Sequence, residues 1–315
     1  MIYSVRHITT FGYDPPIRES VMEVRMQPRS EAHQRCLTFY LDVVPRTNVM
    51  VYRDFSGNLV HHFDIPRRHG RARVTAQALV EVQPILEPQA SSSGGWQDLD
   101  KMIATGDFWE SLLPSHFAHN TDLLQEFSRE LKLVRTNSLL EFVFNLNTSL
   151  YTAFDYVPNS TDVDSSIDDS LRTRAGVCQD FAHIMIALMR EFGIPSRYVS
   201  GYLFHPGHTS DRSPESATHA WVEAFVPGPG WIGLDPTNNI LAGERHIRVA
   251  IGRDYADVPP TRGVYKGESQ SELGVSVTVT PSDAPPPEDI PPVTVTRSRV
   301  IAGDDSANQY DQQQQ

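Results

Sequence analysis

Residues 174–183 read Arg-Ala-Gly-Val-Cys-Gln-Asp-Phe-Ala-His, and this stretch places a cysteine where a helix begins. Apolar side chains recur at helical spacing over 181–192, and Gly193 ends the pattern. Because Gly176 permits a tight turn just before the helix, Cys178 is expected in or beside its first turn. A helix N-terminus stabilises a thiolate and offers free backbone N–H groups to an oxyanion, so Cys178 is a candidate nucleophile. The alternative is a buried structural cysteine.

Two strand-like segments follow at 218–226 and 231–239, and a turn rich in proline and glycine separates them. The first carries His219 and the second carries Asp235. A four-residue loop between the strands would place Asp235 on the face opposite His219, whereas a five-residue loop would place the two side chains diagonally on one face. A β-bulge would have the same effect as the five-residue loop. We expect the second arrangement, in which Asp235 lies within hydrogen-bonding distance of His219.

The order cysteine, histidine, aspartate is the order of groups in a thiol-dependent catalytic triad. In this interpretation Cys178 attacks the substrate, His219 takes the thiol proton, and Asp235 orients the imidazole. Taken singly, His219 could be a core histidine and Asp235 a turn residue before Pro236. The trio could also ligate zinc, but no further cysteine or histidine joins it in these segments, so we expect no metal and no cofactor.

Three further residues are expected to line the same site. The hydroxyl of Tyr156 could complete an oxyanion hole with the backbone N–H of Cys178, or the ring could simply pack. Gln179 lies beside the nucleophile on the helix and could line the site. Trp221 is expected to belong to the core or to form a wall of the cleft.

The rest of the chain divides by composition and periodicity. Segments of period-two alternation predict a β-rich N-terminal domain over 1–90, and amphipathic patterns at 121–131 and 138–151 predict a helical connection over 91–151. We expect the catalytic core over 152–268. A proline-rich segment with one possible added strand covers 269–302, and a disordered tail covers 303–315.

Composition excludes several classes of protein. The chain has 315 residues, of which 39% are hydrophobic and 21% charged, so a globular protein with a sizeable core is expected. Its net charge of −12 disfavours nucleic acid and anionic membrane surfaces as partners. We find no apolar run of the ~20 residues that a spanning helix needs, and no signal peptide. Two cysteines give no disulfide framework, so the cytosol is the expected compartment. Nothing indicates the oligomeric state.

Three blocks of this sequence resemble the transglutaminase-like superfamily in its bacterial branch: GVCQDFAHIMIALMREFGIPSRYVSGYL at 176–203, THAWVEAFVPGPGWIGLDPTNN at 218–239, and HIRVAIGRDYADVPPTRGVYKG at 246–267. The β-rich segment 1–82 is similar to the N-terminal domain of that branch. The resemblance implies an α+β fold with a papain-like cysteine (transglutaminase-like) core and a β-rich N-terminal domain. It also implies that Cys178, His219 and Asp235 occupy the triad positions, and that Tyr156 matches an aromatic position.

The superfamily includes peptide cross-linkers, peptidases, amidases and inactive forms, so the resemblance implies acyl transfer through a thioester on a peptide or protein substrate. We expect hydrolysis by a peptidase or amidase, because water needs only an open site whereas an amine acceptor needs a site that excludes water. The alternatives are cross-linking of the protein-glutamine transglutaminase type and a non-catalytic interaction module.

Overall fold

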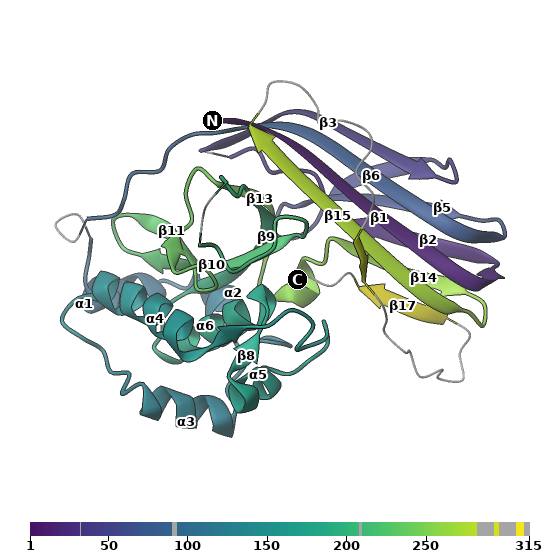
Figure 1. Cartoon of the computed structure of the whole chain (residues 1–315). Coiled ribbons are helices and arrows are strands. Elements are labelled where there is room, and N and C mark those ends of the chain that lie inside the picture. The colour runs from purple at the N-terminus through teal and green to yellow at the C-terminus, as the bar shows by residue number, and fades with distance from the viewer. Residues whose placement is uncertain (32, 90–92, 208–209, 282–292, 296–306, 312–315) are drawn as a thin grey trace.

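The computed structural model describes residues 1–31, 33–89, 93–207, 210–281, 293–295 and 307–311. It is an α+β structure in which a sandwich of two β-sheets lies beside a core of helices packed on a third sheet (Figure 1). This is the expected α+β class, and the N-terminal region is rich in β-strands as expected.

The sandwich consists of two antiparallel sheets whose inner faces share one apolar core. The first sheet contains, in spatial order, β16 (Val293–Val295), β15 (Gln270–Pro281), β1 (Ile2–Ile17), β6 (His69–Val82) and β3 (Gln34–Val44). The second contains β17 (Ala307–Asp311), β14 (Thr261–Lys266), β2 (Glu19–Val24), β5 (Leu59–Ile65) and β4 (Val49–Arg53). Alternate side chains of these strands, such as Phe11, Met22, Phe63 and Val74, are buried between the sheets.

The sandwich is not formed by the first 90 residues alone. β14, which the sequence analysis assigned to the core, pairs with β2, and β15 pairs with β1 along twelve residues. Periodicity identifies a strand but does not identify its partner, and these partners are more than 200 residues apart in the chain. β17 adds to the outer edge of β14, which differs from the disordered tail expected there. The rest of that tail lies outside the described residues.

The core has helices on one face of its sheet and the sandwich on the other. The sheet order is β12 (Ile240–Leu241), β11 (Gly230–Asp235), β10 (His219–Val226), β9 (Ser196–Leu203) and β13 (His246–Gly252). The helices are α1 (Trp96–Ile103), α2 (Trp109–Leu112), α3 (Asp122–Glu130), α4 (Leu139–Ala153), α5 (Ile167–Thr173) and α6 (Cys178–Glu191). A parallel pair, β7 (Asp155–Tyr156) and β8 (Ala175–Gly176), precedes α6, and a short 3-10 helix η2 (Tyr255–Asp257) follows β13.

The two expected helices are present and begin where the sequence offers a cap. Thr121 accepts a hydrogen bond from the backbone N–H of Leu124 at the start of α3, and Ser138 accepts one from Glu141 at the start of α4. These helices pack with α6 in one apolar cluster, so the segment expected to be a connection belongs to the core. None of the helices in the described part of the chain is long and apolar enough to cross a bilayer.

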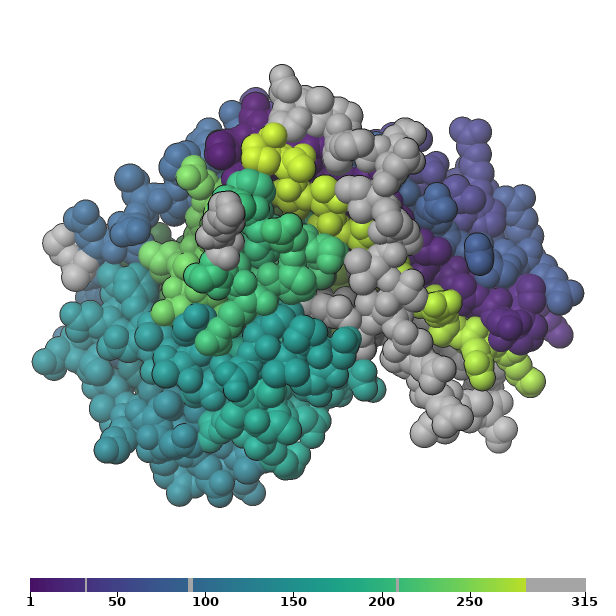
Figure 2. Space-filling view, in the orientation of Figure 1, coloured from purple at the N-terminus to yellow at the C-terminus, as the bar shows by residue number. Residues whose placement is uncertain are grey.

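The sandwich and the core meet along an apolar interface. Side chains of β1, β6 and β15 pack against Tyr202 of β9 and against Ile247 and Val249 of β13. The backbone N–H of Val277 in β15 also donates to the carbonyl of Ser216. In the space-filling view the green atoms of the core lie directly against the yellow-green atoms of β15 (Figure 2). The sandwich therefore supports the strands that carry the candidate site.

His183 gives the core a testable dependence on pH. Its ring is buried, stacks on Phe117, and accepts a hydrogen bond from the backbone N–H of Tyr255. Burial lowers the pKa of His183 to about 4, whereas an unfolded chain takes up this proton near pH 6.5. The unfolded state therefore binds the proton first as pH falls, and stability is lost between those two values.

We expect this histidine to lower the free energy of unfolding by about 2 kcal/mol between pH 7 and pH 5. Urea denaturation at the two pH values measures the loss. The matched variant His183→Gln, which does not titrate, should lose correspondingly less. An equal loss in both proteins would contradict the assignment.

Candidate active site

Cys178 is the first residue of α6, as the sequence analysis expected. Asp180 accepts a hydrogen bond of 2.8 Å from the backbone N–H of Val177 and another of 2.6 Å from the hydroxyl of Thr161, which fixes the first turn. A Cβ atom at position 176 would lie 2.9 Å from the Asp180 side chain, so the turn before the helix requires Gly176. Burial raises the pKa of Asp180 to about 6, against the opposing effect of these hydrogen bonds.

The turn between β10 and β11 decides where Asp235 lies. Phe225 pairs with Trp231 and Val222 with Leu234, which is the register that the five-residue alternative required. The expected contact is present, because Nε2 of His219 lies 2.7 Å from Oδ2 of Asp235. Both side chains are buried.

Asp235 is held by five hydrogen-bond donors. Its Oδ1 accepts from the backbone N–H groups of Thr237 and Asn238 at 3.0 and 3.2 Å. Its Oδ2 accepts from His219, from the side-chain amide of Asn238 at 2.8 Å, and from Nε2 of His246 at 3.2 Å. Burial alone would raise the pKa of Asp235, but the two imidazoles outweigh burial and hold the pKa well below its usual range. Asp235 is therefore both a turn residue and an ionised partner of His219.

The second nitrogen of His219 remains available for chemistry. Nδ1 is buried and has no hydrogen-bond partner among the described residues. Burial would lower the pKa of His219, but the charge and hydrogen bond of Asp235, together with the neighbouring side chain of Cys178, raise it above its ordinary value. The structure thus brings together the three residues expected to form a triad: Cys178, His219 and Asp235.

Tyr156 and Gln179 flank the cysteine on either side. Tyr156 lies on β7, opposite Gly176, and its hydroxyl is buried without a hydrogen-bond partner among the described residues. Burial raises the pKa of this phenol, and the nearby Cys178 raises it further. Gln179 is 2% exposed and donates 3.0 Å to the carbonyl of Val163, so this side chain fastens the loop that follows β7.

Trp221 forms a wall behind the imidazoles rather than an exposed surface of a cleft. It is fully buried, its ring centroid lies 6.1 Å from that of His219, and its edge meets the ring of His246 at 5.1 Å. The indole lies over Gly201, where a Cβ atom would approach it to 2.6 Å. This contact fixes the indole beside the ring of His219.

His246 belongs to the site and was missed by sequence reasoning. It begins β13, is 4% exposed, and contacts Oδ2 of Asp235. The segment that contains it was quoted above only as part of the resemblance. A histidine eleven residues after the aspartate follows no spacing rule, so only the folded arrangement of β11 and β13 identifies it.

His219, Asp235 and His246 form the kind of cluster that can hold a metal ion, with ligand atoms within 4.8 Å of one another. The hydrogen bonds argue against that use. Nδ1 of His246 accepts from the backbone N–H of Gly243 at 3.3 Å, so the neutral ring carries its proton on Nε2. That Nε2–H points at Asp235, which leaves no lone pair there for a metal. The donor set does not fit a zinc ion.

The candidate site is closed. Cys178 and Asp235 have no exposed surface, and His219 is 2% exposed. Two loops are fastened around it: the loop after β7 through Gln179, and the loop after β9 through Arg212, whose guanidinium donates to the carbonyls of Tyr151 and Phe154. In this conformation, burial limits access to the thiol of Cys178.

Comparison with known proteins finds two family profiles in this chain. The profile of the transglutaminase-like superfamily matches residues 125–236, and that of the bacterial transglutaminase-like N-terminal region matches residues 3–81. An uncharacterized protein of Mycobacterium leprae is 34% identical over 88% of this chain and 97% of its own length. An uncharacterized protein of Mycobacterium bovis is 35% identical over 89% of this chain and 92% of its own length.

Two further matches are a curated enzyme and a solved structure. The protein-glutamine gamma-glutamyltransferase of Pseudomonas aeruginosa is 32% identical over 123 residues, which are 36% of this chain and 18% of that protein. A solved structure from Cytophaga hutchinsonii, described as a candidate cysteine protease, has a TM-score of 0.70 at 23% identity and covers 99% of this chain and 98% of its own. That likeness shows a shared fold over the whole chain.

Proposed function

Because this chain belongs to the transglutaminase-like superfamily, we propose that it is a cysteine-dependent acyl-transfer enzyme that hydrolyses peptide or amide bonds through a thioester. In this proposal Cys178 is the nucleophile, His219 the general base and acid, and Asp235 the group that orients His219. The observation that carries the proposal is the buried contact of 2.7 Å between His219 and an ionised Asp235, which leaves Nδ1 free beside a thiol at a helix N-terminus.

The first half-reaction transfers the acyl group to sulfur. Sγ of Cys178 attacks the carbonyl carbon while the thiol proton passes to Nδ1 of His219. The imidazolium is stabilised by Asp235 through Nε2–H. When the tetrahedral intermediate collapses, the C–N bond breaks and the leaving amine takes the proton from His219. The products are a free amine and a thioester on Cys178.

The oxyanion of that intermediate needs hydrogen-bond donors. The first N–H groups of a helix have no partner within the helix, and Cys178 stands at that end of α6. We propose that the backbone N–H of Cys178 and the hydroxyl of Tyr156 donate to the oxyanion. The unpartnered, buried hydroxyl of Tyr156 supports this role.

In the second half-reaction, water or an amine attacks the thioester. Either nucleophile gives its proton to His219, the C–S bond breaks, and the thiol of Cys178 is restored by that proton. An amine acceptor would need an apolar channel, which Trp221 of β10 and Trp231 of β11 could wall. We favour water because both tryptophans have other contacts. Trp221 is buried over Gly201, and Trp231 is stacked under the guanidinium of Arg197 at 4.1 Å.

The proposed partner is a peptide or protein substrate rather than nucleic acid or a membrane, in keeping with the net charge of −12. We propose a cytoplasmic location, which the two free cysteines support because cytosolic thiols stay reduced.

Selective labelling of the two thiols tests the proposal against the alternative of a non-catalytic interaction module. Burial raises the pKa of Cys36 to about 11, so this thiol serves as an internal control. With a small alkylating agent at neutral pH, Cys178 should be modified much faster than Cys36, as measured by peptide mass spectrometry. Selective labelling should disappear in His219→Ala. If Cys178 stays unmodified while Cys36 reacts, the interaction module is favoured.

A competition experiment distinguishes hydrolysis from cross-linking. The enzyme receives a peptide library together with an excess of a primary amine, and mass spectrometry compares the free acid with the amine adduct. We expect the free acid to dominate, because Trp221 is fully buried and presents no surface to an amine acceptor. Dominance of the adduct would overturn the hydrolase proposal and support the transferase alternative.

A further inference from the structure

His246 has no assigned part in the proposed chemistry, yet it donates to the same carboxylate oxygen as the candidate base. Its Nε2–H donates to Oδ2 of Asp235 at 3.2 Å, and His219 donates to the same oxygen at 2.7 Å. Burial lowers the pKa of His246, so the ring is neutral and donates through its dipole rather than a charge. Gly243 fixes the tautomer by donating to Nδ1.

We propose that His246 is a positioning residue for His219. It holds Oδ2 of Asp235 and limits how strongly that carboxylate stabilises the protonated form of His219. The N-terminal domain keeps His246 in place through β13. This inference rests on the proposed function of Cys178, His219 and Asp235. It adds a role for the N-terminal domain, which otherwise has no part in the chemistry.

The argument begins with the proton that His219 must both accept and release. A buried carboxylate at 2.7 Å stabilises the imidazolium strongly, and an imidazolium that is too stable does not pass its proton to a leaving amine. A second N–H donor on the same oxygen withdraws charge from that contact. His246 therefore moderates the effect of Asp235 while also fixing its orientation.

The groups that act on the charge of His219 come from four elements. They are Asp235 at the end of β11, His246 on β13, Cys178 on α6, and His205 in the loop after β9. His205 is itself paired with Asp211 at 3.2 Å. His246 acts on His219 through their shared oxygen of Asp235, and its ring also lies beside that of His219, with the centroids 6.1 Å apart.

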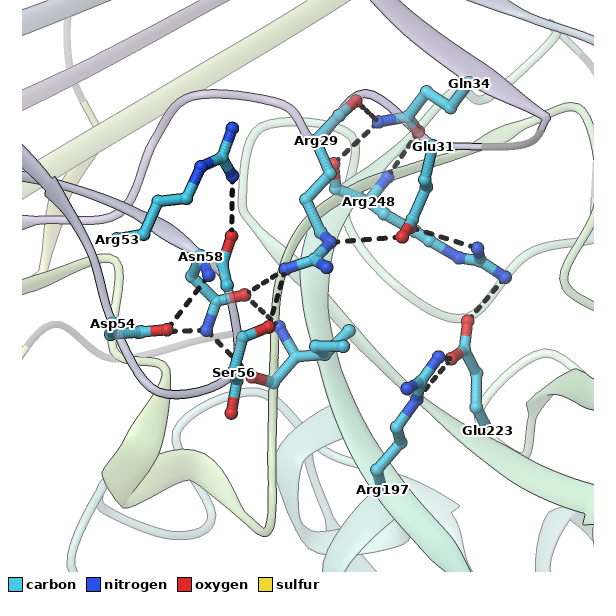
Figure 3. Close-up of polar contacts among 12 residues, drawn as sticks. Arg29, Glu31, Gln34, Arg53, Asp54, Ser56, Asn58, Arg197, Glu223 and Arg248 are labelled. Atoms are coloured by element: carbon cyan, nitrogen blue, oxygen red, sulfur yellow. Dashed lines mark hydrogen bonds and ion pairs between the residues drawn. The ribbon is translucent and has the colours of Figure 1, made fainter.

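Two side-chain amides of the N-terminal domain form hydrogen bonds with the backbone of β13, the strand that carries His246 (Figure 3). β13 is the edge strand of its sheet, so one row of its backbone groups lacks a strand partner. Gln34 accepts from the N–H of Arg248 at 2.8 Å and donates to its carbonyl at 2.9 Å. Asn58 makes the same pair of contacts with Ile251, at 2.9 and 2.8 Å. We call these four hydrogen bonds the amide clamp.

An ion-pair network reinforces the amide clamp and reaches β10. Arg248 pairs with Glu31 of the N-terminal domain at 3.1 Å and with Glu223 at 2.5 Å (Figure 3). Glu223 is buried on β10, four residues after His219, and also pairs with Arg197. The network therefore joins the domain to the strand of His246 and to the strand of His219.

The amide clamp is close enough to His246 to control its position. Arg248 lies two residues after His246, and the register of β13 with β9 shifts between Arg248 and Ala250. Such an irregularity redirects the side chains beside it and interrupts the regular hydrogen bonding between the two strands. The clamp holds one residue on each side of the shift, so the N-terminal domain fixes the backbone where the sheet alone does not.

The test is a titration of His219 by NMR in protein labelled with ¹⁵N at histidine, which requires no substrate. In His246→Phe, which keeps the bulk of the ring and removes the donor, we expect the pKa of His219 to rise by less than about one pH unit, because Asp235 loses the hydrogen bond and transmits only part of the change to His219. His246→Gln, whose amide can donate, should restore most of the wild-type value. His183→Gln serves as the buried-histidine control and should leave the titration unchanged.

The outcomes separate this inference from the proposed function. If Asp235→Asn shifts the pKa of His219 but His246→Phe does not, the role of His246 is overturned while the triad stands. If neither variant shifts it, the proposed triad fails as well. If His246→Phe lowers the pKa of His219, His246 does not moderate Asp235, and the inference is overturned.

The contribution of the N-terminal domain is tested in the full chain. Gln34→Ala and Asn58→Ala each remove half of the amide clamp, and each should move the pKa of His219 in the same direction as His246→Phe but by less. Gln77→Ala on β6, whose strand neighbours are β1 and β3, is the matched control. Folded clamp variants with the wild-type titration would overturn the role of the domain.

Discussion

Replacing Cys178 with alanine is expected to abolish turnover and leave the fold intact. Thioester chemistry needs this sulfur, and the other cysteine, Cys36, lies on β3 in the sandwich. Alanine is the best helix former, and the first turn of α6 is held by Asp180 rather than by the thiol. The change should therefore remove the nucleophile with little effect on stability.

Two measurements check this expectation. Product formation from a peptide library, followed by mass spectrometry, should fall to background in Cys178→Ala and remain at the wild-type level in Cys36→Ala. Thermal unfolding of Cys178→Ala should stay close to that of the wild type. Turnover by Cys178→Ala at the wild-type rate would refute the thiol mechanism.

The local parts of the fold could be predicted because they depend on neighbouring residues. The helix that begins at Cys178 follows from an apolar stripe and a preceding glycine, and the helices at Asp122 and Leu139 each follow a capping hydroxyl. These signals act within one or two helical turns, so a sequence pattern contains them in full.

The domain boundary could not be predicted because it depends on strand pairing between distant segments. Alternation of apolar residues at 261–266 indicates a strand, but nothing in that segment specifies β2 as its partner. The sandwich is closed by residues that follow the core in the chain. Its free edges at β14 and β15 then accept the short strands β17 and β16.

The candidate site also contains features that the local sequence predicts and features that depend on distant segments. The sequence offered two registers for β10 and β11, and the one that pairs Phe225 with Trp231 is present and brings Asp235 to His219. The choice followed from the chemistry expected of the pair, not from the turn itself. His246 could not be found in this way because its contact with Asp235 depends on the N-terminal domain holding β13.

The loss expected from changing the other two members of the triad is nearly as large as that from Cys178→Ala. We expect Asp235→Asn to keep the fold and lower kcat on the order of 10³–10⁴-fold, and His219→Ala to cost at least as much because it removes the base itself. Asp254→Asn is the matched control, since Asp254 is also buried and accepts backbone N–H groups, from Phe117 and Ala256, outside the site.

The reason lies in the donors that converge on Asp235. Its Oδ1 accepts two backbone N–H groups, so an asparagine must place its oxygen there and its amide N–H₂ toward His219. Two donors then face each other unless the imidazole changes tautomer and accepts at Nε2. The proton would move to Nδ1, and the base could no longer take the thiol proton of Cys178. Steady-state kinetics and thermal unfolding of the three variants check this expectation, and an unchanged kcat in Asp235→Asn would reduce Asp235 to a turn residue.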